Sequence, residues 1–145
     1  MSESGKTIGE VEGVLRLIAE LKSCDGIGAT ALAKLESAVT RVTTRFAVRV
    51  LDTVDFHHLD EDLSEGRLDP RFVPIVKKSV EMADPVFFPA ALKELATKLK
   101  TSLLKLEAAL VNRDLGSSSS ASHEAHELYH QLQHEVEEWL RSGLD

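Results

Sequence analysis

The sequence is poor in cysteine and in aromatic residues. Cys24 is the only cysteine among 145 residues, so neither an intrachain disulfide nor a multi-cysteine metal site is possible. A lone thiol fits a reducing compartment, and we therefore expect an intracellular, cytoplasmic protein. Aromatic residues make up 5% of the chain, whereas alanine, leucine, glutamate and lysine are abundant. That composition favours helices.

Long apolar runs and an excess of positive charge are also missing. Glu10, Glu12 and Arg16 interrupt the apolar residues near the N-terminus, so we expect neither a signal peptide nor a membrane span. The net charge is −7, whereas proteins that bind phosphate backbones carry clustered lysine and arginine. The composition therefore predicts no membrane association and makes nucleic acid an unlikely partner. The length suits one domain.

The longest helical pattern lies in residues 89–112. Leucines recur there every three or four residues, which places one apolar stripe along a helix about 36 Å long. A second, smaller stripe lies on the opposite face, so we expect a central helix with neighbours on both sides. The first stripe comprises Leu92, Leu95, Leu99, Leu103, Leu106 and Leu110, and the second comprises Leu104, Ala108 and Val111.

Apolar residues with the same period predict four further helices, over residues 7–23, 29–54, 74–83 and 121–141. The second of these is rich in β-branched residues, which leaves a strand at residues 39–50 as an alternative. Residues 52–69 hold seven acidic residues against one arginine, and we interpret them as an acidic connector, with room for one short helical turn. The predicted fold is an all-α bundle of about five helices.

A serine-rich segment precedes the last of these helices. Residues 114–122 have the composition of a flexible linker, which divides the chain into a helical bundle over 1–113 and a C-terminal amphipathic helix within 123–145. A tethered helix can dock on its own bundle or on another chain. We therefore expect a non-enzymatic, adaptor-like interaction protein that binds a protein partner or itself. The expected partner-binding residues are Leu128, Leu132, Val136 and Trp139.

The C-terminal helix also carries a short histidine motif. Residues 126–130, His-Glu-Leu-Tyr-His, fit H-E-x-x-H and resemble the zinc helix of zincin metallopeptidases. The resemblance implies zinc bound by His126 and His130, with Glu127 as general base. It covers five residues, and Val136 stands where the longer form of the motif has its third histidine.

Metal binding without catalysis is the broader alternative. His126, His130 and His134 recur every four residues, and imidazole suits Zn, Ni and Cu. On a helical wheel these side chains, with His123, point away from Leu132 and therefore toward solvent. The competing interpretation is a polar helix face that contains histidines by chance. A possible divalent metal is the only cofactor that the sequence suggests.

Two further features concern anionic partners. Residues 25–35 resemble the hairpin of helix-hairpin-helix DNA-binding motifs, in which a turn such as Gly26-Ile27-Gly28 presents backbone N–H groups to a phosphate. A plain glycine-rich link between antiparallel helices explains the same residues. Arg41, Arg45 and Arg49 form a basic ridge on the next helix. We expect this ridge to pair mainly with the acids of residues 52–69.

Overall fold

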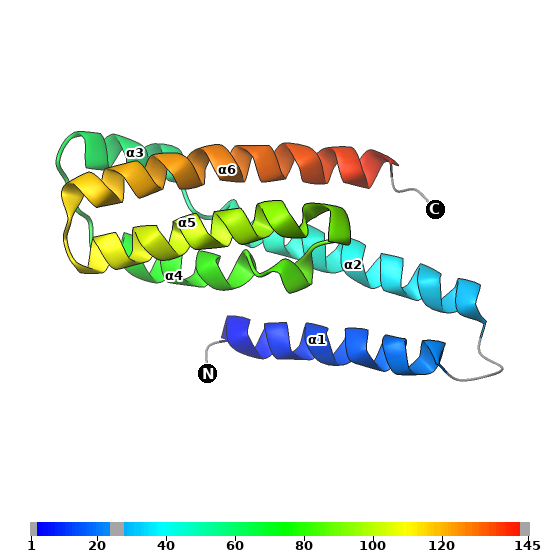
Figure 1. Ribbon diagram of the computed structural model, residues 1–145. Coiled ribbons are helices and arrows are strands. Elements are labelled where there is room, and N and C mark those ends of the chain that lie inside the picture. The colour runs from blue at the N-terminus through cyan, green and yellow to red at the C-terminus, as the bar shows by residue number, and fades with distance from the viewer. Residues whose placement is uncertain (1–2, 24–27, 143–145) are drawn as a thin grey trace.

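The described residues, 3–23 and 28–142, form six α-helices and two 3-10 helices in the computed structural model (Figure 1). No strand occurs in these residues, so the all-α prediction is confirmed and the strand alternative at residues 39–50 is wrong. Within them, no helix is both long and apolar enough to cross a membrane. The elements are α1 (Glu3–Lys22), α2 (Ala29–Leu51), α3 (Phe56–Ser64), α4 (Phe72–Met82), η1 (Pro85–Phe87), η2 (Ala90–Leu92), α5 (Lys93–Val111) and α6 (Leu115–Ser142).

Helix α5 carries the centre of the core, as its leucine stripe predicted. Leu99, Leu103 and Leu106 are fully buried, Leu95 is half-buried, and α4 and α6 pack along the helix (Figure 1). The second stripe differs from the prediction. Its two largest residues, Leu104 and Val111, are 48% and 61% exposed, because no described element covers that face of α5.

The acidic connector contains a helix of nine residues, α3. Phe56, Leu59 and Leu63 recur at helical spacing and are buried, and they dock α3 against α6. The carboxylate of Asp55 caps the helix by accepting a hydrogen bond from the backbone N–H of His58. The charged residues between these apolar positions obscured the period in the sequence.

Helix α6 begins inside the segment that was predicted to be a linker, so that prediction is wrong from Leu115 onward. Asp114 caps the helix: its carboxylate accepts hydrogen bonds from the backbone N–H and the hydroxyl of Ser117, and these bonds lower the pKa of Asp114. Ser118 and Ser122 are buried, as are Ala121 and Ala125. Side chains this small let α6 lie close alongside its neighbours α5 and α3, so the serines act as packing residues (Figure 1).

A turn of three residues, 112–114, joins α5 to α6. Arg113 has a φ of 56° and is the only non-glycine residue with positive φ in the described parts of the chain. The backbone N–H of Asp114 donates to the carbonyl of Ala109 at 3.0 Å, a bond that closes the C-terminus of α5. The two helices therefore form an antiparallel hairpin.

Helices α1 and α2 form a second antiparallel hairpin, which extends beyond the other helices at its outer end (Figure 1). A salt bridge from Lys22 to Glu36 joins the two helices there. The N-terminal part of α1 reaches α4 and η1. Among residues 8–22 of α1, for which burial is described, Ile18 is the most buried. Most of α1 lies at the surface, which determines where apolar side chains are exposed.

Candidate functional site

The exposed large apolar side chains are concentrated on the α1–α2 hairpin. Among the described residues, nine such side chains are at least about one-third exposed, and five of them belong to this hairpin. We call these five the α1–α2 strip: Val14 and Leu17 on α1, with Leu35, Val42 and Phe46 on α2. Exposed apolar side chains gathered on two adjacent helices mark an interaction site more often than scattered single residues do.

A groove of about 370 Å³ runs between the two helices within this strip. Its wall is almost entirely apolar and includes Val14 and Val42, with Glu10 as the only charged residue that lines it. Leu35, Val42 and Phe46 lie at helical spacing in the sequence. The structure leaves these side chains uncovered, because α1 packs beside this face of α2 and no described helix lies across it.

The residues that the sequence proposed for partner binding lie on the inner face of α6. Leu132 and Val136 are buried in the core, and Leu128 and Trp139 are half-buried against it. The guanidinium of Arg41 lies 5.9 Å from the centre of the Trp139 ring, within the range of a cation–π contact. The apolar face of α6 is therefore used within the chain, whereas the side chains of the α1–α2 strip remain exposed.

Two of the three arginines of the basic ridge on α2 do not pair with the acidic segment as expected. Arg45 and Arg49 are exposed and have no hydrogen-bond or ion-pair partner among the described residues. The acids bind nearer arginines instead: Asp62 lies 2.7 Å from Arg67, and Asp69 lies 2.7 Å from Arg71. Hydrogen bonds from Arg71 lower the pKa of Asp69. Arg45 and Arg49 therefore remain available at the edge of the strip.

A second candidate site lies where α3 covers the middle of α6. His126 is half-buried there, with its Nδ1 2.7 Å from a carboxylate oxygen of Asp60 and its ring stacked on Phe56. Its Nε2 lies 2.8 Å from the Nε2 of His130. The hydroxyl of Ser122 donates to the other oxygen of Asp60. We call this set the Asp60–His126–His130 cluster.

The cluster departs from the predicted histidine stripe. His126 does not face solvent, because α3, which the sequence did not reveal as a helix, covers it. His134 has no hydrogen-bond or ion-pair partner in the described residues, and the Nε2 of His123 lies 3.2 Å from the carboxylate of Glu127 instead. No group of three or more histidine, cysteine, aspartate or glutamate side chains that could hold a metal ion occurs within residues 3–23 and 28–142.

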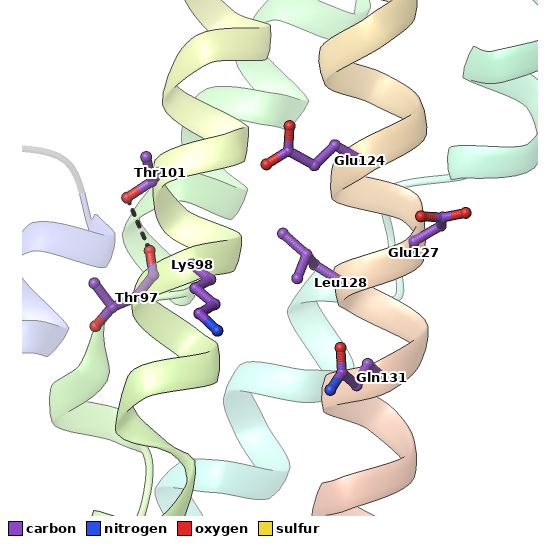
Figure 2. Close-up of a pocket in the computed structure, with 7 residues that line it drawn as sticks. All are labelled: Thr97, Lys98, Thr101, Glu124, Glu127, Leu128 and Gln131. Carbon is purple, nitrogen blue, oxygen red and sulfur yellow. Dashed lines mark hydrogen bonds between the residues drawn. The ribbon is translucent and has the colours of Figure 1, made fainter.

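The glutamate of the H-E-x-x-H motif lies apart from the two histidines. Glu127 borders a groove of about 360 Å³ between α5 and α6, into which Leu128 points toward Lys98 (Figure 2). His126 and His130 line a different cavity of about 310 Å³, which Asp52 and Tyr129 also line. The motif therefore does not assemble a general base beside the imidazole pair.

The glycine-rich turn between α1 and α2 lies largely outside the described residues. Gly26 and Ile27 are among residues 24–27, so the phosphate-binding interpretation of that turn is not addressed by the structure. Leu35, at the end of the same stretch, belongs to the α1–α2 strip. No protein-family model matches the chain, and no curated protein or solved structure matches it either.

Proposed function

We propose that this chain is a non-enzymatic interaction protein that associates with a second copy of itself through the α1–α2 strip. The observation that carries the proposal is the exposure of five large apolar side chains on two adjacent antiparallel helices. Covering a side chain of this size contributes about 1.5 to 3 kcal/mol when burial is complete. A surface of this kind favours association over exposure to water.

The spacing of the strip supports a helical partner. On α2, Leu35, Val39, Val42 and Phe46 follow one another at intervals of four, three and four residues. On α1, Val14, Leu17 and Leu21 follow at intervals of three and four. This pattern forms the apolar seam of coiled coils and four-helix bundles, in which side chains of one helix insert between those of the next. The hairpin has the pattern of half of a four-helix bundle.

The charges beside the strip support a second copy of the same chain as the other half. Glu10 on α1 is exposed at the groove, and Arg45 and Arg49 are exposed on α2, with no ion-pair partner in the part of the chain that the structure describes. A twofold axis parallel to the hairpin would lay α1 across α2 of the partner subunit in antiparallel order. Glu10 would then lie near Arg45 of the partner subunit. Each copy supplies both signs of charge, so the surface is self-complementary.

Light scattering and sedimentation equilibrium of the full chain test the proposal. The wild type is expected to form a dimer, and Val42→Glu is expected to convert it to a monomer with an unchanged helical circular dichroism spectrum, because burying an unpaired carboxylate at the seam is costly. Val111→Glu is the matched control, since Val111 is also an exposed valine but lies on α5, outside the strip. That variant is expected to remain dimeric. A monomeric wild type at every concentration, or equal dissociation of both variants, would contradict the proposal.

A further inference from the structure

We propose that His126 and His130 bind one divalent transition-metal ion through their Nε2 atoms, with Asp60 as the residue that orients His126. The two Nε2 atoms face each other across 2.8 Å. A metal about 2.0–2.1 Å from each of two imidazole nitrogens holds those nitrogens about 3 to 3.4 Å apart. In the metal-free protein His130 Nε2 donates to His126 Nε2. A shift of that proton to Nδ1 of His130 and a small rotation of its exposed side chain make room for the ion.

The contact between Asp60 and His126 supports this assignment. A carboxylate accepts a hydrogen bond, so its distance of 2.7 Å from Nδ1 places the ring proton on Nδ1 and leaves the lone pair on Nε2. Histidine ligands of metals are commonly oriented in this way by a carboxylate behind the ring. Ser122 in turn donates to the other carboxylate oxygen, and Phe56 stacks on the ring. His126 is thus held in the tautomer and orientation that a metal requires.

The surroundings of the pair indicate which kind of ion it suits. Two neutral imidazoles favour borderline ions such as Zn²⁺, Ni²⁺ and Cu²⁺ over Mg²⁺ and Ca²⁺, and Cu²⁺ binds tightest in that series. The described residues offer no third side chain in a ligand group, so water completes the coordination. The adjacent cavity of about 310 Å³ gives water access to the pair. The site therefore takes an exchangeable ion rather than a structural one.

Binding of Zn²⁺ and Cu²⁺ chlorides to untagged, chelator-treated protein, measured by isothermal titration calorimetry, tests the assignment. We expect one ion per chain, with Cu²⁺ tighter than Zn²⁺. His130→Ala should weaken binding at least tenfold without unfolding the protein, because His130 is exposed. Asp60→Asn should weaken it about 10- to 100-fold, the range for residues that orient a ligand. His134→Ala is the matched control and should leave the affinity unchanged.

Long-range nitrogen–proton spectra of the imidazoles give an independent readout. Addition of Zn²⁺ should shift the Nε2 resonances of His126 and His130 and leave those of His134 in place. Absence of metal binding to the folded wild type would overturn the proposal. An equal loss of affinity in His134→Ala would overturn it as well, because it would place the ion on the outer part of the helix. An unchanged affinity in Asp60→Asn would remove the orienting role of Asp60.

Discussion

The hydroxyl of Tyr129 on α6 donates a hydrogen bond to the carboxylate of Asp52, the C-cap residue that follows α2. Tyr129 is buried, and Phe56 packs against its ring. Burial is the main cause that raises the pKa of the Tyr129 phenol well above its ordinary value near 10, and the bond to Asp52 adds to it. Tyr129 is the only tyrosine in the chain, so its ionisation can be followed without interference.

The first prediction concerns alkaline pH. The unfolded chain ionises Tyr129 near pH 10 while the folded chain does not, so the stabilising contribution is complete below pH 10 and is lost as pH rises above it. Ultraviolet absorbance of tyrosinate should therefore appear together with loss of helical circular dichroism. In Tyr129→Phe this loss of stability above pH 10 should vanish. The free energy of unfolding at neutral pH should be lower by about 0.5 to 1.5 kcal/mol, because the hydrogen bond to Asp52 is gone. Ionisation near pH 10 with the helices intact would contradict the burial of this phenol.

The second prediction concerns the two faces of α5. Leu99→Ala should lower the free energy of unfolding by about 2 to 5 kcal/mol, because it opens a cavity in the core. Leu104→Ala removes the same atoms from a side chain that is 48% exposed, and its effect should stay within about 0.5 kcal/mol. Urea unfolding of the two variants measures both changes. Similar losses in both would mean that the exposed face of α5 is covered in solution.

The third prediction concerns the buried serines of α6. The hydroxyl of Ser118 has no hydrogen-bond partner in the described residues, whereas that of Ser122 donates to Asp60. Ser118→Ala should raise stability by about 0.5 to 2 kcal/mol, since it removes an unsatisfied polar group and adds a better helix former. Ser122→Ala should lower stability through loss of its bond. Thermal and urea unfolding distinguish the two, and a loss in Ser118→Ala would indicate that its hydroxyl has a partner.

The fourth prediction concerns the glycines of α1. A Cβ at Gly9 or Gly13 meets nothing within 4 Å. Gly13→Ala should therefore stabilise α1 by about 0.5 to 1 kcal/mol, seen as slower amide hydrogen exchange in that helix. Gly66 is the opposite case: its φ of 82° is unfavourable for alanine, so Gly66→Ala should destabilise the protein. Faster exchange of α1 in Gly13→Ala would show that this glycine packs closely against another surface.

The sequence predicted the helices whose apolar period is uninterrupted. The leucine stripe of α5 is the clearest case, because its members recur every three or four residues along the whole helix. The sequence indicated at most one helical turn at α3, because the segment is short and the three acids 60–62 separate Leu59 from Leu63. The serines of residues 117–122 suggested a linker because their side chains are small and polar. In a tight helix–helix contact the small size of Ser118 and Ser122 is what matters, and composition does not reveal that contact.

The candidate sites were predicted less well, for a related reason. Helical periodicity identifies an apolar face but does not tell which faces the remaining elements cover. The stripe through Val42 and Phe46 is exposed, whereas the stripe through Leu132 and Val136 is buried. The helical wheel of the last helix predicted that His126 faces solvent. That prediction failed because α3, which the sequence did not reveal as a helix, covers this side chain. Its contact with Asp60 joins residues 66 positions apart, which no local pattern could indicate.

The short turn at residues 112–114 has a consequence for the order of folding. Closing a loop of three residues costs little chain entropy, so the α5–α6 pair can form before contacts that span most of the chain. The contact between Arg41 and the carbonyl of Leu140 joins residues 99 positions apart and belongs to a later step. Substitutions in the α5–α6 contact should therefore slow refolding, whereas those in α1 should mainly speed unfolding. Arg113, with its left-handed backbone, therefore joins the two helices that we expect to pair first.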